Sequence, residues 1–363
     1  VIPAQALAAE LSARGHHLVF FTDRRGMRYA SLFPEMPVYE VASAPFRSGI
    51  VAKVVSALRM VAGTFRALRL IRMLKPAAVV GFGGYPSVPA GLAAAITGLP
   101  LCLHEQNAVF GRSNRLLARF ARMLTLSFAR TTRVPRHPSV HVTGNPVRPA
   151  IVELAAGDYE APDADGEFRL LVIGGSQGAT VLSDVVPAAI SALPKGSYSR
   201  LRIVQQTREE DLERVTRLYE QLGIAAEIMP FVEDLPRRLA DAHLVIARAG
   251  ASTISELSVA GRPAILVPYP AATDDHQTMN AVELTQSGGA WTIAQRDFTP
   301  AQLAKLLQGL MRDPQRLADA ARAARGVGRP QAAAELADLV ERLIVARGPL
   351  AALPVESDER TAA

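Results

Sequence analysis

The chain has 363 residues, of which 49% are hydrophobic and 20% are charged. This balance is typical of a globular protein and excludes an intrinsically disordered one, and the length allows two domains with a core each. The single cysteine, Cys102, excludes a disulfide framework and fits a reducing compartment.

Charge is distributed unevenly along the chain. The formal net charge is +6, but residues 1–150 hold 19 Lys/Arg and 5 Asp/Glu, a net charge of +14. The remaining residues hold 21 Lys/Arg and 29 Asp/Glu, a net charge of −8. A protein polarised in this way is expected to turn its first half toward an anionic partner.

The first predicted elements are a helix that includes Pro3 and ends at Gly15, and then a buried strand over residues 16–21. Short apolar runs alternate with helical patterns along the rest of the chain, which predicts parallel sheets with crossover helices. The other predicted strands are residues 77–82, 100–104, 123–128 and 140–143 in the first half, and 168–173, 201–205, 243–247 and 263–268 in the second.

Residues 76–103 contain no charged side chain, and the segment is long enough to span a bilayer. Its glycines and prolines favour a buried strand, glycine loop, helix and strand over a transmembrane helix. The segment GNPVRP at 144–149 predicts a domain boundary. We therefore expect a first domain over 1–149, a second over 150–347 whose last helix could pack back on the first, and a flexible tail over 348–363.

Two segments repeat one pattern. AVVGFGGYPS (78–87) and LLVIGGSQGA (170–179) each combine an apolar strand, a glycine pair, a small polar residue and a helix start. Such turns present backbone N–H groups to a phosphate at the positive end of a helix, although a single loop of this kind is equally often a tight turn without a ligand. Two matching loops favour phosphate binding and predict a doubly Rossmann-like α/β protein with its site in a cleft.

Two motifs that the loops lack restrict which phosphate compound could bind. Neither loop has the Gly-Lys-Ser/Thr of a nucleotide hydrolase or the G-x-G-x-x-G of a dinucleotide site. The position of the expected ribose carboxylate falls near Lys195 after the second loop and near Glu105 after the first. Nucleotide hydrolysis is therefore disfavoured, and nicotinamide binding is weakened but stays open.

The segment ARAGASTISEL (247–257) predicts a turn at Arg248 and a helix that opens at Ser252 and Thr253. The helix N-terminus and the Thr253 hydroxyl suit a diphosphate. Glu256, one turn further on, could accept hydrogen bonds from sugar hydroxyls or simply complement the helix dipole. In DDHQ (274–277), the Gln277 amide suits hydroxyl recognition, with ordinary helix capping as the alternative.

The segment LHEQNAVFGRSN (103–114) gathers polar residues at the end of a predicted strand. His104 and Glu105 have the chemistry for proton transfer or hydroxyl recognition, and the alternative is a buried polar cluster that only ties the domains together. His276 has no second His or Cys at a metal-ligand spacing, so no metal site is expected.

Six segments in order along the chain resemble the MurG family, the membrane-associated N-acetylglucosaminyltransferases that make lipid II for peptidoglycan. They are GFGGYPSVPAG (81–91), HEQNAVFGRSN (104–114), TGNPVRPAI (143–151), GGSQGA (174–179), ARAGASTISEL (247–257) and DDHQTMNA (274–281). The resemblance implies the GT-B fold, with two Rossmann-like domains facing a cleft, and a role in cell-wall synthesis, cell shape and cell division. In that family, VIPA (1–4) corresponds to the residues directly after a first glycine loop that ends in His. We therefore expect the first strand, that loop and its His, the leading candidate for the general base, to be absent here.

The resemblance also implies the site residues. For UDP-GlcNAc, Ser176 would contact the diphosphate, the backbone of Val232 the uracil, Glu256 the ribose hydroxyls and Gln277 the GlcNAc hydroxyls. The other residues that would hold this donor are Asn107, Arg148, Ala251, Ser252, Thr253, Ile254 and Ser255. The acceptor diphosphate would face Gly83, Gly84 and Tyr85, near His104, Glu105 and Asn114.

The family reaction is an inverting displacement, in which the muramoyl C4 hydroxyl of the undecaprenyl-linked acceptor, lipid I, attacks the anomeric carbon of UDP-GlcNAc. No cofactor and no metal are expected, so we expect the leaving diphosphate to be held by helix N-termini, backbone N–H groups and Arg248. Among the residues present, Glu105 and His104 are the second choices for the general base.

A basic, apolar stretch lies in the first domain. Its cations are Arg47, Lys53, Arg59, Arg66, Arg69, Arg72 and Lys75, and they run alongside apolar residues that include Phe65. The pattern fits a surface on anionic inner-leaflet lipid, at about 1 kcal/mol for each cation, although a core-packing helix with a solvated basic face is the alternative. The resemblance implies a peripheral protein on the cytoplasmic face of the bacterial inner membrane, with cell-wall assembly proteins as further partners.

Two other functions remain open from sequence. A UDP-GlcNAc epimerase of the same architecture would use the same donor but would leave the basic apolar stretch unexplained. Nucleic-acid binding would call for basic residues interleaved with stacking aromatic residues, a pattern that the chain does not have. We therefore expect no nucleic-acid partner.

Overall fold

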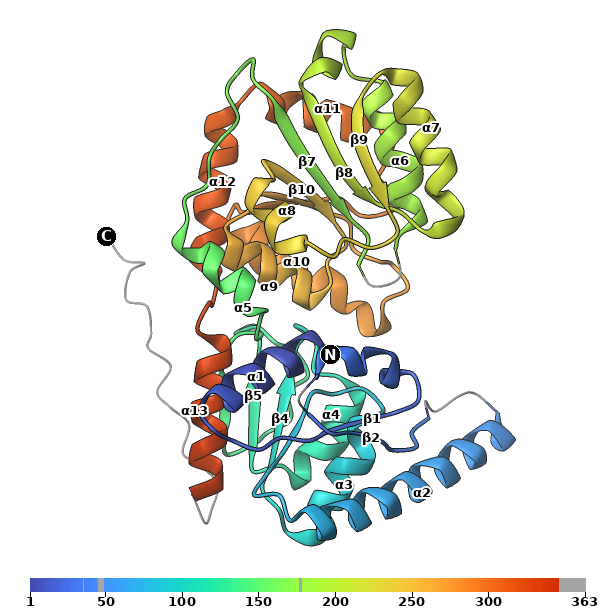
Figure 1. The fold of residues 1–363 in the computed structure, drawn as a ribbon, viewed down its shortest axis with the longest axis vertical. Helices are drawn as coiled ribbons and strands as arrows, with labels where there is room; N and C mark the ends of the chain where they lie inside the picture. The colour runs from blue at the N-terminus through green and yellow to red at the C-terminus, as the bar shows by residue number, and fades with distance from the viewer. Residues whose placement is uncertain (35, 45–48, 176–177, 346–363) are drawn as a thin grey trace. The chain divides into compact units, whose positions relative to one another are not determined.

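The structure is a computed structural model that describes residues 1–34, 36–44, 49–175 and 178–345. The chain divides into two compact units (Figure 1). Unit 1 comprises Val1–Gln106, Phe110–Gly144 and the chain from Ala332, and unit 2 comprises Asn107–Val109 and Asn145–Gln331. The segment predicted as a flexible tail, 348–363, lies outside the described residues.

Unit 1 contains a parallel sheet in the order β3-β4-β5-β6 and a separate parallel pair, β1-β2. Its elements are α1 (Ile2–Ala13), β1 (Phe20–Thr22), η1 (Gly26–Leu32), β2 (Val38–Glu40), α2 (Ile50–Leu74), β3 (Val79–Gly81), α3 (Ser87–Thr97), β4 (Leu101–Glu105), α4 (Arg112–Leu117), η2 (Ala118–Phe120), β5 (Met123–Leu126), β6 (Val140–Val142) and α13 (Ala332–Val345).

The strand β4 divides the core of unit 1 into two parts, because successive side chains of a strand point to opposite faces. Leu101 and Leu103 pack with α3 and α4, in a cluster that includes Phe110 and Leu117. Cys102 packs on the other side, with Leu7 of α1 and several leucines of α13. Helix α13 therefore completes the core of unit 1 although it is far from the other elements in sequence.

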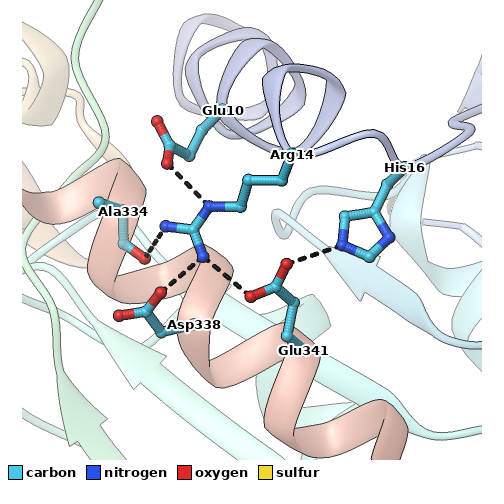
Figure 2. A network of polar contacts seen from close by, with 6 residues as sticks. All are labelled: Glu10, Arg14, His16, Ala334, Asp338 and Glu341. Carbon is cyan, nitrogen blue, oxygen red and sulfur yellow. Dashed lines mark hydrogen bonds and ion pairs between the residues drawn. The ribbon is translucent and has the colours of Figure 1, made fainter.

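A polar network joins α1 to α13 beside this core (Figure 2). The guanidinium of Arg14 donates to Asp338 at 2.5 Å and to Glu341 at 2.9 Å, and also to Glu10 within α1. His16 contacts the other oxygen of Glu341 at 2.8 Å. These contacts orient α13 on α1. The buried leucines of α13 provide most of the apolar surface that the two helices bury together.

Unit 2 contains one parallel sheet in the order β12-β11-β10-β7-β8-β9. Its elements are α5 (Pro149–Val152), η3 (Glu153–Ala156), β7 (Phe168–Ile173), α6 (Thr180–Ser191), η4 (Lys195–Arg200), β8 (Leu201–Gln206), η5 (Glu209–Asp211), α7 (Leu212–Leu222), β9 (Ala225–Met229), α8 (Leu235–Asp241), β10 (Leu244–Ala247), α9 (Ala251–Ala260), β11 (Ala264–Leu266), η6 (Thr273–Asp275), α10 (His276–Gln286), β12 (Ala290–Thr292), α11 (Pro300–Met311) and α12 (Pro314–Val327).

All described strand pairs of this sheet are parallel, so the carboxyl ends of its strands meet at one edge. The loops that follow β7, β8, β9, β10 and β11 therefore gather there. Ligands of open α/β sheets bind outside the carboxyl ends of the strands. This edge of unit 2 is where the fold brings polar loop residues together.

The division into units differs from the expected boundaries. Unit 2 begins at Asn145 rather than at residue 150, and α13, the last helix, which could pack back on the first domain, lies with unit 1. The boundary follows Gly144, which adopts a left-handed φ of 81°. Helix α5 packs on α9 of unit 2, so the segment from Asn145 onward lies with that unit.

The strands predicted from apolar runs are confirmed, each with ends within two residues of the expected ones, except that the first begins later, at Phe20. Three strands were missed: β2, β9 and β12. Of these, β9 and β12 are the edge strands of their sheet and β2 belongs to the isolated pair. Edge strands are partly exposed and carry polar residues, so they lack the continuous apolar pattern of a buried parallel strand.

Candidate active site

The loop after β10 leads into the amino-terminal end of α9 in unit 2. Gly250 is the N-cap in an extended conformation, and Ile254 N–H donates to its carbonyl at 2.9 Å. The N–H groups of the first turn, from Ala251 on, have no intrahelical acceptor, which makes this end a site for an anion. Ser252 and Thr253 are partly exposed there, and the predicted helix start is confirmed.

The side chains of Ile254 and Ser255, at the end of this turn, contact the protein itself. The Ser255 hydroxyl donates to the Ala251 carbonyl at 3.0 Å, and the Ile254 side chain is buried. Both side chains therefore stabilise the first turn, and at these two positions only backbone groups can face a ligand.

Arg248 lies two residues before this N-cap. Its Nη1 donates to the carbonyls of Val267 and Pro268 at 3.1 and 3.3 Å, and its guanidinium lies over the Tyr269 ring. Burial lowers the pKa of Arg248, but an arginine stays protonated in a protein. A buried cation next to the positive end of a helix is unfavourable unless an anion binds near both.

Arg148 and Glu256 form an ion pair within unit 2. Nε and Nη2 of Arg148 both donate to Oε1 of Glu256, at 3.0 and 2.8 Å. The carboxylate is 4% exposed, and its burial raises the pKa of Glu256 while Arg148 opposes that rise. Because both hydrogen bonds meet at Oε1, Oε2 is the oxygen that can accept from a ligand hydroxyl.

The loop between β11 and α10 has a constrained backbone. Asp274 and Asp275 have φ values of 55° and 54°, the left-handed region that side chains other than glycine seldom adopt. Strain of this kind costs about 1–3 kcal/mol at each residue and is found at functional sites. The side-chain Oε1 of Gln277 accepts from Tyr269 N–H at 2.9 Å. Gln277 thus ties the start of α10 to the loop that precedes it rather than capping its helix, and its amide nitrogen can donate to a hydroxyl.

Asn280 was missed by the sequence analysis, although it lies within one of the resemblance segments. Its side chain is fully buried. Its Oδ1 accepts from Ala108 N–H at 2.8 Å, and its Nδ2 donates to Asn107 Oδ1 and to the Ala249 carbonyl, each at 3.2 Å. One amide therefore holds Asn107 beside the loop that precedes α9.

The glycine loop after β7 is described in part, because Ser176 lies outside the described residues. Gly175 and Gly178 have left-handed φ values of 80° and 67°. Gln206, also missed from sequence, hydrogen-bonds this loop and the segment after β9. The Val232 side chain in that segment is buried, and no hydrogen bond to its backbone is found in the described part of the chain.

The first glycine turn lies in unit 1, between β3 and α3. Gly83 and Gly84 have consecutive left-handed φ values of 72° and 71°, and the Ser87 hydroxyl donates to the Gly83 carbonyl at 2.6 Å. A Cβ at Gly83 would lie 3.2 Å from Nδ2 of Asn114. Tyr85 follows directly and completes the turn into α3.

His104 and Glu105 do not have the access that a general base needs. The His104 ring is fully buried and contacts the hydroxyls of Thr125 at 2.9 Å and Ser127 at 3.3 Å. Oε2 of Glu105 accepts from Gly111 N–H and from Asn114 Nδ2, both at 2.8 Å. Their burial and these hydrogen bonds favour a structural role over the expected proton transfer. These hydrogen bonds stay within unit 1 and do not tie the domains together.

No group of three or more His, Cys, Asp or Glu side chains in the described residues could hold a metal ion. His276 contacts the Thr273 carbonyl at 2.7 Å. That contact orients the ring toward its own loop.

Helix α2 carries the basic stretch of unit 1. Its inner face packs closely, because a Cβ at Gly63 would lie 1.9 Å from the Ala42 carbonyl oxygen. Its outer face exposes large apolar side chains, with Leu58 64% and Phe65 70% exposed. Exposed cations accompany them, namely Lys53, Arg59, Arg66, Arg69, Arg72 and Lys75. Arg47 lies outside the described residues, and none of the described helices combines the length and apolarity of a membrane span.

Comparison with known proteins identifies the family. The glycosyltransferase family 28 N-terminal domain matches residues 1–125, and the C-terminal domain of that family matches residues 169–343. A protein from Rhodospirillum centenum is 51% identical over 94% of this chain and 90% of its own length. One from Sphingopyxis alaskensis is 48% identical over 94% and 88%. Both are called UDP-N-acetylglucosamine--N-acetylmuramyl-(pentapeptide) pyrophosphoryl-undecaprenol N-acetylglucosamine transferase.

A crystal structure of MurG from Acinetobacter baumannii matches with a TM-score of 0.75 at 33% identity, over 94% of this chain and 95% of that one. The chain belongs to the MurG family of glycosyltransferases. The predicted α/β class, with two Rossmann-like units of the GT-B type, is confirmed.

The MurG family membership also decides between two enzymes. A UDP-GlcNAc 2-epimerase from Neisseria meningitidis has a TM-score of 0.64 at 12% identity, over 94% of this chain and 96% of that one. At that identity the likeness shows a common fold alone. The epimerase alternative is therefore not favoured.

Proposed function

We propose that this chain transfers GlcNAc from UDP-GlcNAc to the C4 hydroxyl of undecaprenyl-diphospho-MurNAc-pentapeptide, lipid I, to give lipid II and UDP. Family membership supports the reaction, and the names of its relatives describe the same transfer. The structural observation that carries it is the pair of partly exposed Arg148 and buried Glu256 beside the open end of α9.

The donor is proposed to bind in unit 2. The diphosphate lies at the N–H groups of Ala251 to Thr253 with Arg248 beside it, and Ser176 of the glycine loop contributes to the same group. Glu256 accepts from the ribose hydroxyls through Oε2, while Arg148 opposes the rise in the pKa of this carboxyl that burial causes. The uracil meets the backbone of Val232, and Gln277 donates to the GlcNAc hydroxyls.

In the inverting reaction, the acceptor hydroxyl attacks the anomeric carbon from the face opposite the diphosphate and gives its proton to a general base, while the bond from the anomeric carbon to the diphosphate breaks and UDP leaves. Negative charge develops on the leaving diphosphate, so fixed donors at that position stabilise the transition state. Each such donor is worth about 3 kcal/mol. No proton transfer is assigned to His104 or Glu105, because their groups are already used within unit 1.

The acceptor is proposed to bind at unit 1. Two successive glycines in the left-handed region present a turn to the acceptor diphosphate, and Asn114 lies beside it. The outer face of α2 is proposed to contact anionic lipid on the cytoplasmic face of the inner membrane. Its exposed Leu58 and Phe65 would enter the headgroup region, while the cations would meet lipid phosphate. Cell-wall assembly proteins are proposed as further partners.

Calorimetric titration tests the donor site. We expect UDP-GlcNAc to bind more tightly than UDP-glucose, and Glu256→Ala to lose this binding. Thr285→Ala is the control, since that hydroxyl lies on the same unit and contacts Thr292 at 2.7 Å. Equal binding of both sugars, or unchanged binding by Glu256→Ala, would contradict the proposal.

Vesicle flotation tests the membrane surface. We expect binding to vesicles that contain anionic lipid, weakened by high salt and by the pair Leu58→Ser/Phe65→Ser. Val345→Ser is the matched control, because Val345 is 83% exposed on another helix of the same unit. Binding that ignores both salt and the α2 substitutions would contradict the lipid contact.

A further inference from the structure

Gln206, the last residue of β8, lies between two loops of the proposed donor site. In the sheet order, β8 is flanked by β7 and β9. Its carboxyl end therefore has the glycine loop on one side and the segment that contains Val232 on the other. The Gln206 side chain is 6% exposed, so its amide is directed at protein groups.

The hydrogen bonds of this amide reach both loops. Oε1 accepts from Gly174 N–H at 3.1 Å. Nε2 donates to the Gly175 carbonyl at 3.0 Å and to the Pro230 carbonyl at 3.1 Å. A glutamine amide has two N–H hydrogens, so both are used, one on each loop. A single planar group thus sets the distance between the loops.

The glycine loop needs such an anchor. Glycine has more backbone freedom than any other residue, and that freedom must be lost when the loop is ordered. Within the loop, Gly178 N–H donates to the same Gly175 carbonyl at 3.1 Å. Gln206 adds one bond on each side of the Gly174–Gly175 peptide and connects it to the end of β9.

We propose that Gln206 is a positioning residue for a nucleoside diphosphate. It holds the phosphate-binding glycine loop and the base-binding segment after β9 at the spacing of a base and its diphosphate. The ligand then binds both loops without ordering them first, which raises its affinity. This inference rests on the proposed donor site, since it assigns the two loops to two parts of one ligand.

The neighbouring residue supplies a matched control. Gln205 is fully buried on the same strand, and its side chain points to the opposite face. Its Nε2 donates to the Leu182 carbonyl at 3.5 Å, and its Oε1 accepts from the Tyr219 hydroxyl at 2.7 Å. Gln205→Leu therefore removes buried hydrogen bonds of similar number without touching either loop.

The experiment is calorimetric titration with UDP, together with thermal unfolding, on the unaltered chain, Gln206→Leu, Gln206→Glu and Gln205→Leu. We expect Gln206→Leu to weaken UDP binding by about tenfold or more, equivalent to about 1.4 kcal/mol. Gln206→Glu has the same size and keeps the acceptor but lacks both donors, so it should weaken binding to a similar degree. If Gln206→Leu does not fold, Gln206→Glu carries the test by itself.

Gln205→Leu should lower the unfolding temperature while UDP affinity stays within about twofold of the unaltered chain. In steady-state assays with lipid I, we expect the Gln206 variants to raise KM for UDP-GlcNAc with little change in kcat, as for a lost uniform binding interaction. Equal losses of UDP affinity in the Gln205 and Gln206 variants, or unchanged affinity in the Gln206 variants, would overturn the inference. The absence of UDP binding by the unaltered chain would overturn the donor site itself and this inference with it.

Discussion

Unit 1 and unit 2 both place polar residues where a strand ends, but they use them differently. In unit 1, the His104 ring and the Glu105 carboxylate meet hydroxyl, amide and backbone groups of the same unit. In unit 2, Arg148 occupies only Oε1 of Glu256, and the first N–H groups of α9 have no intrahelical acceptor. A polar residue near a strand end is thus a stronger binding candidate where helix N–H groups without an intrahelical acceptor lie beside it.

The largest expected effect comes from breaking the pair in unit 2. Arg148→Leu leaves the Glu256 carboxylate buried without its cation, a change that costs about 3 kcal/mol or more of the free energy of unfolding. Urea denaturation at neutral pH measures this cost. The double variant Arg148→Leu/Glu256→Leu should recover part of the stability but not UDP-GlcNAc binding. If the double variant recovered both stability and UDP-GlcNAc binding, the pair would have only a structural role, like the polar cluster of unit 1.

The cluster in unit 1 should affect stability alone. Glu105→Gln replaces a carboxylate that accepts two hydrogen bonds at 2.8 Å, so we expect a loss of about 1–2 kcal/mol in the free energy of unfolding. Calorimetry should show UDP-GlcNAc affinity unchanged. A large loss of donor affinity in this variant, with stability preserved, would give the cluster a direct role.

A smaller effect is expected from His243 at the opposite, amino ends of the strands in unit 2. Burial lowers the pKa of His243 to about 4, and Arg169 and Arg262 add to the shift. The Nδ1 atom accepts from Arg169 N–H at 3.1 Å, which requires the neutral ring. The unfolded chain binds a proton near pH 6.5 and the folded chain near pH 4. The stability contribution is therefore full above pH 6.5 and is lost as the pH falls toward 4.

His243→Asn tests this titration, because its side-chain oxygen can accept the same N–H. The fall in unfolding temperature between pH 6.5 and 4 should be shallower in the variant than in the unaltered chain. Burial and Arg342 also lower the pKa of His141 in unit 1, so His141→Asn is the parallel variant. Identical pH profiles for His243→Asn and the unaltered chain would contradict the assignment.

The smallest effect is expected where α13 returns to unit 1. Arg14→Ala removes contacts with Glu10, Asp338 and Glu341, which are partly exposed (Figure 2). Exposed ion pairs contribute about 1 kcal/mol or less each and are screened by salt. Hydrogen exchange should show faster opening of α13 at low salt, with a smaller difference at high salt. Leu336→Ala is the comparison, since loss of its buried side chain should open α13 at any salt concentration.

The local pattern of the sequence was sufficient for the strands with continuous apolar runs, such as β7, and for the helix start at Ser252 after the Arg248 turn. Periodicity and turn residues act over a few positions, so they can be read from one stretch of chain. The family resemblance added candidate donor residues, which stay predictions. The same local signals missed β9 and β12, which lie at sheet edges and lack a continuous apolar run.

The sequence by itself thus determined the α/β class and the polar residues that follow the strands. Only the tertiary structure decided which of those residues are paired. Arg148 meets Glu256 across 108 positions, Gln206 joins the loops after β7 and β9, and His104 is enclosed by the hydroxyls of β5 and the loop after it. Each outcome depends on hydrogen bonds between segments that are distant in the chain. Their geometry is set by strand order and packing, which no local pattern contains.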